Sequence, residues 1–334
     1  MDNENTAWNE AAAERQLKLA ALYDAMSARI VGQKDLIRSI IICLLCDGHM
    51  LIEGMPGLAK TTAAKTLAEA LEGDFQRIQF TPDLLPSDLI GTDIYLQETG
   101  EFSFRKGPLF NNIILADEIN RAPAKVQSAL LEAMEEKQVT VGLKTYKLPD
   151  LYMVLATQNP IEHEGTYNLP EAQLDRFLMQ VVLDYPSHDE ELEILKLDET
   201  LELRKGSNPS DTVHVVRQED IFKSRDEVAG LYMDDKLRHY AVSLVSATRY
   251  PDRYSEKLSE WIQFGASPRA TLGIVHCAKA LAWLEGDSYV FPHHIQGVAA
   301  NILRHRIIPT FEAEAEGVTR DRIISHLLEV VAIP

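Results

Sequence analysis

Cysteine is scarce in this chain: Cys43, Cys46 and Cys277 are the only three among 334 residues. Three cysteines do not build a disulfide framework. Cys43 and Cys46 have C-x-x-C spacing, but they lie in the apolar run 40–46, and the sequence holds no second pair of ligands. We interpret them as core residues, with zinc binding or redox chemistry as the alternative.

Long hydrophobic runs and basic residues are also in short supply. The longest apolar run, 40–46, is far shorter than the roughly 20 residues that cross a bilayer. The polar N-terminus has no charged-then-apolar signal pattern. With 33 Lys and Arg against 51 Asp and Glu, the net charge is −18, and such a surface repels phosphate backbones at long range. We therefore expect a cytoplasmic protein with no transmembrane segment and no nucleic-acid partner.

The rest of the composition, 46% hydrophobic and 25% charged, is that of a globular protein long enough for two domains. Its most informative stretch is HMLIEGMPGLAKTT, residues 49–62. The pattern predicts a short buried strand at 50–53, a glycine-bearing turn at 54–59 and a helix from Lys60 onward. This is the order of a P-loop, in which backbone N–H groups at a helix N-terminus bind phosphate oxygens.

The P-loop pattern predicts contacts with ATP and Mg²⁺. Lys60 is expected to reach the β- and γ-phosphates, and the Thr61 hydroxyl to bind Mg²⁺. Ala59 stands where the general motif has its second glycine, so the backbone there must suit a residue with a Cβ. The alternative is an ordinary helix N-terminus that carries these residue types. The candidate nucleotide-binding residues of the loop are Gly54, Pro56, Gly57, Leu58, Ala59, Lys60, Thr61 and Thr62.

A second motif, NIILADE at 112–118, ends a predicted buried strand in two carboxylates. Ligands of open α/β sheets bind at this edge of the sheet. We assign Asp117 to Mg²⁺ and Glu118 to the orientation and deprotonation of the attacking water. Acidic residues that only keep a strand end solvated are the alternative.

Two more polar residues flank the remaining predicted strands. The strand at 151–157 is followed by Asn159, a neutral side chain that can hold a water against the γ-phosphate. Arg176 comes just before a last apolar strand at 178–183, and an ion pair with Asp175 is its ordinary alternative.

Between the motifs lie two less regular segments. Residues 81–107 are polar, proline-bearing and longer than an ordinary connection, with a hairpin predicted at 93–104. A second hairpin is predicted at 138–148. An insertion next to a nucleotide site is more often functional than decorative, and a solvated loop is the alternative.

A domain boundary is expected after the last strand. Pro186 interrupts the sheet pattern, and Ser187 with Glu190 forms a capping box that opens a helix at 189–203. A polar linker follows at 205–212. We place an N-terminal helix and the ATPase domain at 1–184, and a helical domain with its linker at 185–334.

The C-terminal half is predicted to be mostly helical, with apolar residues at helical spacing in 237–248 and 271–284. Arg269 lies in the first turn of the second of these helices, where the helix dipole opposes a cation and favours an anionic partner nearby. A solvated helix start is the alternative. His293 and His294 are adjacent, so we expect them to point to different faces of a helix and to be poor metal partners. A solvated helix start after Pro292 is the better interpretation.

Several of these motifs together resemble the MoxR family of AAA+ ATPases: GMPGLAKT, ILADEINRAP, ATQNP and LPEAQLDRF. The resemblance extends through GASPRA and covers about 30–306, and this family also has Ala before the P-loop lysine. It implies an α/β P-loop AAA+ domain whose parallel five-stranded sheet has the order 5-1-4-3-2, an insertion in helix 2, and an all-helical lid domain. It also implies ATP hydrolysis with Mg²⁺ in a homo-oligomeric ring of six subunits.

The same resemblance implies roles for single residues. Asn159 and Arg269 would sense the γ-phosphate, and Arg176 would be an arginine finger that acts on the neighbouring subunit's nucleotide. Arg121 would also face that subunit. The tripeptide Val31-Gly32-Gln33 would line the adenine pocket. A plain turn is the alternative for this tripeptide.

Members of this family are thought to act as chaperone-like remodelling ATPases, often for partners with a von Willebrand factor A domain and a metal-ion-dependent adhesion site. We expect the same function here. Three other classes stay open: a small-molecule phosphotransferase, a nucleic-acid motor and a magnesium-chelatase-like motor subunit. A monomer in the presence of ATP would favour the first, and DNA-stimulated hydrolysis that falls with salt the second. Only a partner assay would separate the third.

Overall fold

The computed structural model describes residues 2–55, 57–98, 100–159, 166–204 and 215–334. Five parallel strands form one sheet in the order β2-β5-β8-β1-β9. Numbered as successive strands of this sheet, the order is 2-3-4-1-5, which confirms the predicted order 5-1-4-3-2. The strands are β1 Met50–Gly54, β2 Phe75–Gln79, β5 Ile113–Asp117, β8 Met153–Gln158 and β9 Met179–Leu183.

The sheet is built from short apolar runs because helices cover both of its faces. Every residue of β5 is buried, and so are the first five of β8. Strand β2 lies at one edge and exposes polar side chains, among them Arg77 and Gln79. Since β2 runs parallel to β5 with Gln79 opposite Asp117, polar residues of both strands meet at the carboxyl edge of the sheet.

Two hydrophobic clusters lie on opposite sides of the sheet. The smaller one packs α5 against alternate residues of the strands, such as Ile114 and Val154. The larger one contains the other face, including Ile52 and Leu115, together with α1 to α3 and the C-terminal helices. The helices of the N-terminal half are α1 Asp2–Ser27, α2 Lys34–Leu45, α3 Lys60–Ala70, α4 Pro86–Ile90, η1 Pro108–Phe110, η2 Ile119–Arg121, α5 Ala124–Glu136 and α6 Glu171–Leu174.

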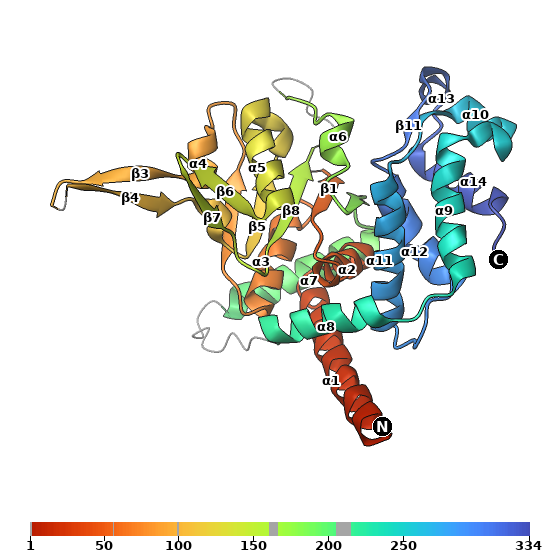
Figure 1. Cartoon of the computed structure of the whole chain (residues 1–334), viewed down its shortest axis with the longest axis horizontal. Helices are drawn as coiled ribbons and strands as arrows, with labels where there is room; N and C mark the ends of the chain where they lie inside the picture. The colour runs from red at the N-terminus through yellow and green to blue at the C-terminus, as the bar shows by residue number, and fades with distance from the viewer. Residues whose placement is uncertain (1, 56, 99, 160–165, 205–214) are drawn as a thin grey trace.

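The C-terminal half is helical, as predicted, apart from a small two-stranded sheet (Figure 1). Two of its helices begin at polar caps that the sequence indicates: Ser267 accepts the N–H of Arg269 at the start of α11, and the predicted bonds between Ser187 and Glu190 are present before α7. The division at 184/185 falls between β9 and α7 and stays a prediction. The elements are α7 His188–Arg204, α8 Gln218–Gly230, α9 Asp235–Arg249, η3 Pro251–Arg253, α10 Glu256–Trp261, β10 Ile262–Phe264, α11 Pro268–Leu284, α12 Pro292–Leu303, β11 Ile308–Pro309, α13 Phe311–Ala315 and α14 Arg320–Val330.

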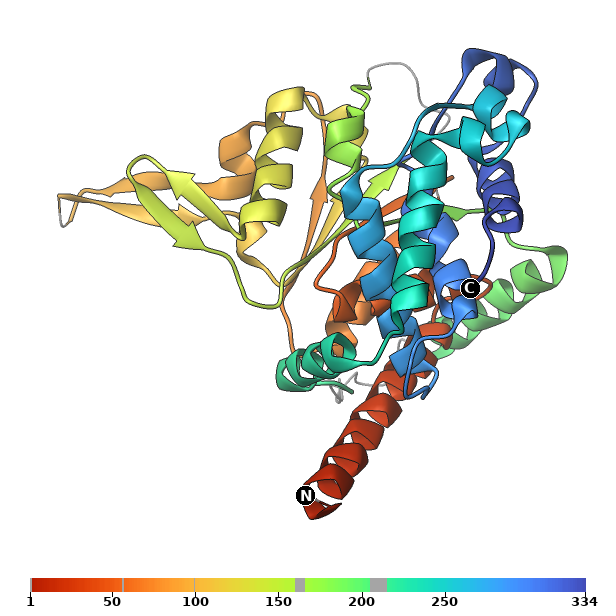
Figure 2. The ribbon, with the colours of Figure 1, turned by 45° about the vertical axis from the view of Figure 1, so that its right-hand side comes forward.

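The insertion after β2 is more regular than the sequence suggested. It holds α4 and a hairpin of β3 Gly91–Leu96 and β4 Glu101–Lys106, which projects from the sheet in both ribbon views (Figures 1 and 2). Gly91 has φ +106°, and a Cβ there would lie 2.2 Å from the Arg105 carbonyl oxygen, so the base of the hairpin requires glycine. The second predicted hairpin is β6 Gln138–Val141 with β7 Lys144–Lys147.

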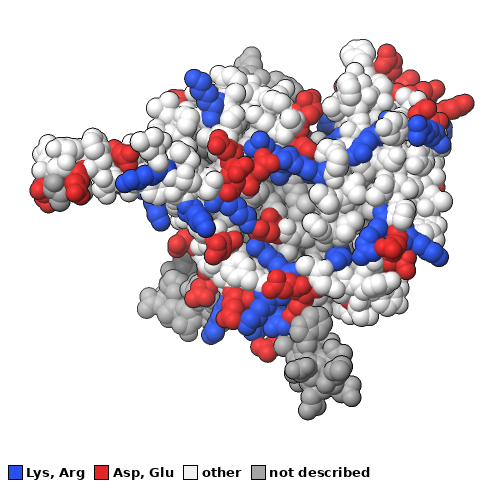
Figure 3. All heavy atoms as spheres, viewed as in Figure 1, with Lys and Arg blue, Asp and Glu red and all other residues white. Residues whose placement is uncertain are grey.

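Cys43 and Cys277 are fully buried and Cys46 is half-buried, which agrees with the prediction that the C-x-x-C pair belongs to the core. Burial raises the pKa of the Cys43 and Cys277 thiols well above the ordinary value, so these thiols are inert. Among the described helices, none is both long and apolar enough to cross a membrane. On the face shown in Figure 3, basic side chains are interspersed with acidic ones.

The expectation that the adjacent histidines point to different faces of a solvated helix start was wrong. His293 and His294 both reach the Glu285 carboxylate, at 3.5 and 3.1 Å, and His294 Nε2 also lies 3.1 Å from Asp287 Oδ2. His294 is fully buried, and its Nδ1 accepts the N–H of Phe291 at 2.9 Å. A neutral ring must therefore carry its proton on Nε2 and donate it to the carboxylates, so hydrogen bonds account for this cluster.

Candidate nucleotide site

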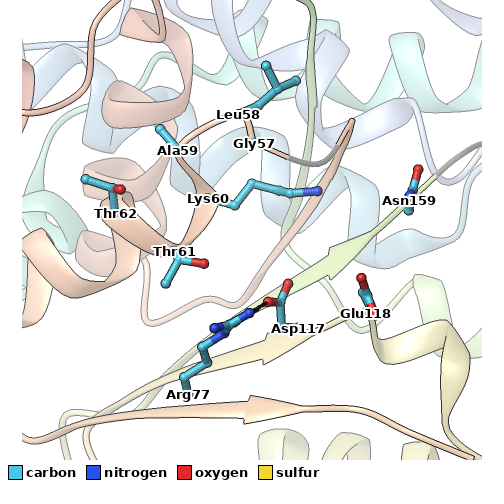
Figure 4. Close-up of a pocket in the computed structure, with 10 residues that line it drawn as sticks. All are labelled: Gly57, Leu58, Ala59, Lys60, Thr61, Thr62, Arg77, Asp117, Glu118 and Asn159. Atoms are coloured by element: carbon cyan, nitrogen blue, oxygen red, sulfur yellow. Dashed lines mark hydrogen bonds and ion pairs between the residues drawn. The ribbon is translucent and has the colours of Figure 1, made fainter. Parts of the chain in front are cut away.

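The predicted P-loop and the two carboxylates line one pocket of about 320 Å³ at the carboxyl edge of the sheet (Figure 4). Sequence motifs that are more than 40 residues apart are brought together because β1, β5 and β8 all end at this edge. The lining residues are Gly57, Leu58, Ala59, Lys60, Thr61, Thr62, Arg77, Asp117, Glu118 and Asn159.

The loop between β1 and α3 has the backbone that phosphate binding requires. Gly57 has φ +87°, and Ala59 has φ +54° in the left-handed region, where a residue with a Cβ is tolerated at a cost of about 1 kcal/mol. Gly54 is needed for a close approach, because a Cβ there would lie 2.9 Å from the Leu183 side chain. The Lys60 ammonium bonds the Gly54 carbonyl oxygen at 2.7 Å. Pro56, also predicted to line the site, lies outside the described residues.

A buried threonine positions both carboxylates. The Thr157 hydroxyl donates to Asp117 Oδ1 at 2.6 Å and accepts the backbone N–H of Glu118 at 2.9 Å. Glu118 has φ +55°, which turns its side chain into the pocket at the end of β5 (Figure 4). Asn159 follows β8 and lines the same pocket. The structure therefore brings Asp117, Glu118 and Asn159 together with the predicted P-loop residues 57–62. Of the predicted P-loop residues that the structure describes, only Gly54 does not line the pocket.

Strand β2 contributes two side chains that the sequence analysis missed. Arg77 bonds Asp117 Oδ2 through Nη2 at 2.6 Å and Nε at 3.1 Å. Gln79 donates to Glu118 Oε2 at 2.8 Å, and Arg121 bonds the same oxygen at 2.9 Å. Arg121 therefore contacts the carboxylate of its own site. The available signal was the R-x-Q spacing, because residues two apart on a strand share one face.

Arg269 and Arg176 are not among the residues that line this pocket. Both arginines form ion pairs with Glu135 on α5, and Arg176 also donates to the Leu131 carbonyl oxygen at 2.9 Å. The two line a separate cavity of about 340 Å³ together with Glu135 and Asp175. The prediction that Arg269 and Asn159 meet at one nucleotide is thus not supported within a single chain, because α11 starts beside α5 and not beside the P-loop.

The loop that carries Arg176 is fixed to the C-terminal helices by Arg306. This buried guanidinium bonds Asp175 Oδ1 at 2.7 Å and the carbonyl oxygens of Phe177 and Leu178 at 2.7 and 3.2 Å. The Ser267 hydroxyl, which caps α11, donates to Asp175 Oδ2 at 2.8 Å. Asp175 is therefore shared by the loop of Arg176 and the start of the helix that carries Arg269.

The tripeptide Val31-Gly32-Gln33 lies against the end of β9 and the start of α7. Gly32 has φ +77°, with the Glu190 carboxylate 2.9 Å from the position of a Cβ, and Gln33 Nε2 bonds the Asp184 carbonyl oxygen at 3.4 Å. The tripeptide does not line the P-loop pocket, and its contact with adenine stays a prediction.

Known proteins share both halves of this arrangement. Residues 49–179 match the ATPase family associated with various cellular activities (AAA), and residues 257–327 match the AAA lid domain. Chaperone MoxR1 of Mycobacterium tuberculosis is 45% identical over 306 residues, which are 91% of this chain and 79% of that protein. Protein MoxR of Paracoccus denitrificans is 32% identical over 330 residues, 93% of this chain and 94% of that one. The crystal structure of a protein from Cytophaga hutchinsonii is similar to this chain, with a TM-score of 0.90 and 46% sequence identity. The match covers 99% of each chain. On its sheet order, its pocket and these relatives, the chain belongs to the MoxR family of AAA+ ATPases.

Proposed function

We propose that this protein binds and hydrolyses ATP with Mg²⁺ in a ring of identical subunits and uses the cycle to remodel partner proteins. One observation carries the proposal: Lys60, Asp117, Glu118 and Asn159 line one pocket, whereas Arg176 lies outside it. A single chain thus holds a nearly complete site for phosphoryl transfer but keeps its predicted finger elsewhere.

The pocket residues have distinct roles in this proposal. The Lys60 ammonium binds the β- and γ-phosphates, and the Glu118 carboxylate takes a proton from the attacking water, which Asn159 orients. The Thr61 hydroxyl and the Asp117 carboxylate are hard oxygen donors on facing sides of the pocket (Figure 4), a donor set that suits Mg²⁺. When bound, this ion would neutralise charge on the phosphates.

Arg176 and Arg269 act together on the nucleotide of the next subunit in this proposal. Their guanidinium groups meet at Glu135, so a γ-phosphate from a neighbour could pair with both. Such an interface is head-to-tail, and a head-to-tail contact closes into a ring when its rotation permits. This assignment replaces the expectation that Arg269 senses the nucleotide beside Asn159.

Mixing two inactive variants tests the arrangement. Lys60→Ala should lose ATP binding, and Arg176→Ala should bind ATP but hydrolyse it about 10³-fold more slowly or worse. Co-assembled, the two should regain activity, because some interfaces pair an intact P-loop with an intact finger. The control is the double variant mixed with Lys60→Ala, which cannot form a complete interface. Mixed assemblies that stay inactive at every ratio would contradict an arginine supplied in trans.

A protein partner is supported by the family and by the projecting hairpin. Tyr95 and Phe102 near its tip are 54% and 70% exposed, and their rings pack 5.3 Å apart. Exposed aromatic side chains are typical of protein contacts. From the family resemblance we propose partners with a von Willebrand factor A domain. A pull-down with Glu118→Gln in ATP, compared with ADP, tests this: recovery of no such protein in ATP would contradict it.

A further inference from the structure

Arg77 holds the carboxylate that the proposed function assigns to Mg²⁺. Its guanidinium bonds Asp117 Oδ2 through Nη2 at 2.6 Å and Nε at 3.1 Å, and Figure 4 shows it reaching Asp117 from β2. The other carboxylate oxygen accepts the Thr157 hydroxyl at 2.6 Å. Both oxygens of Asp117 are therefore engaged in the structure.

The burial of Asp117 explains why this pair forms. Its side chain is only 12% exposed, and a buried carboxylate without a counter-charge is strongly disfavoured. Arg77 supplies that charge from the edge strand, where its own side chain is 49% exposed. The guanidinium can thus return to water at little cost, whereas the carboxylate cannot move away from β5.

A divalent cation and Arg77 compete for the carboxylate of Asp117. Mg²⁺ takes oxygen ligands, directly or through its bound waters, and Oδ2 already accepts two bonds from Arg77. Gln79 offers Arg77 a second acceptor, since its Oε1 lies 3.0 Å from Nη2. Arg77 can therefore release Asp117 and keep a hydrogen bond to its own strand.

We propose that Arg77 is an internal counter-ion that stands in for the metal at Asp117 and is displaced when Mg²⁺ and ATP bind. This inference rests on the proposed ATP site. Arg77 is then a positioning residue that sets how much the metal adds to nucleotide affinity. It neutralises Asp117 while the site is free, and its competition lowers the gain from Mg²⁺.

The test compares nucleotide binding with and without metal. The Kd of a fluorescent, slowly hydrolysed ATP analogue is measured for the full chain in EDTA and in excess Mg²⁺. The Kd in EDTA divided by the Kd in Mg²⁺ is the ratio that reports how much the metal adds to affinity. Arg77→Gln removes the charge and should raise that ratio about tenfold, the loss of one charge-assisted pair. Arg77→Lys keeps the charge and should stay nearer to the wild type.

Arg38→Gln is the matched control, because Arg38 forms an exposed ion pair with Asp35 on α2 at 2.9 Å. Its ratio should equal that of the wild type. A cooperative thermal unfolding transition above the assay temperature establishes that each variant is folded. A ratio for Arg77→Gln that is unchanged or lower overturns the inference alone, because a lower ratio would mean that Arg77 supports the metal-bound nucleotide. A wild type that does not bind the analogue overturns the proposed ATP site, and this inference with it.

Discussion

Replacement of Arg306 by Met should destabilise the protein more than any surface substitution of the same kind. The Arg306 side chain is 3% exposed, and its guanidinium bonds Asp175 Oδ1 and four backbone carbonyl oxygens. Burial lowers the pKa of Arg306, and the hydrogen bond to Asp175 offsets only part of this shift. Methionine fills part of the volume but donates no hydrogen bond.

The expected loss follows from the partners left behind. Removing one partner of a buried ion pair costs about 3 to 5 kcal/mol. Asp175 keeps the hydroxyl of Ser267 at 2.8 Å, so we take about 3 kcal/mol for the carboxylate. Carbonyl oxygens that lose a donor add roughly 1 kcal/mol where water cannot reach them. We expect a total loss of about 4 kcal/mol.

Urea-induced unfolding followed by tryptophan fluorescence measures this loss. The matched control is Arg238→Met. Arg238 and Asp235 both lie on α9 and form an ion pair, and their side chains are 49% and 83% exposed, respectively. This control should cost less than about 0.5 kcal/mol. A loss below about 1 kcal/mol for Arg306→Met would refute the reasoning, since it would mean that the loop of Arg176 is held by other contacts.

Three further predictions concern single residues. Glu118→Gln should bind ATP and assemble normally but stall hydrolysis, as measured by phosphate release; loss of ATP binding would give the carboxylate another role. His49 is buried, and burial lowers its pKa to about 4, so the unfolded chain takes up a proton that the folded chain does not as the pH falls from 6.5 to 4. Stability should fall by about 3 kcal/mol through this window from His49 alone, and His49→Asn should flatten the urea-midpoint profile; equal slopes would contradict the assignment. Ala59→Gly should relieve the left-handed backbone and change stability by less than about 1 kcal/mol in thermal denaturation, and a larger loss would show that the Ala59 methyl group is needed for packing.

The parts of the site that lie at strand ends could be predicted from the sequence. Lys60, Asp117 and Asn159 each follow a short apolar run, and parallel strands place their carboxyl ends at one edge, so local patterns were sufficient. The left-handed backbone of Ala59 was not predicted. The sequence led us to expect a backbone that suits a residue with a Cβ, whereas the loop keeps the conformation of the motif glycine, with φ +54°.

Contacts made across elements could not be predicted in this way. The bond between Arg77 and Asp117 depends on which strand pairs with β5, and no local pattern states that partner. The meeting of Arg176 and Arg269 at Glu135 likewise depends on where α11 docks. Helical periodicity also misplaced His293 and His294, because it ignores acceptors in the preceding turn.

The common hydrophobic core of the sheet and the lid limits how the molecule can move. One cluster runs from β1 and β9 through α2 to α11 and α12. A hinge that opened roughly 400 Å² of this apolar contact would cost about 10 kcal/mol. This cost exceeds the difference in binding free energy, about 5.5 kcal/mol, by which a ligand shifts a two-state population from 1:99 to 99:1. Nucleotide-driven motion is therefore expected to keep this apolar area buried, as small shear movements of packed helices do.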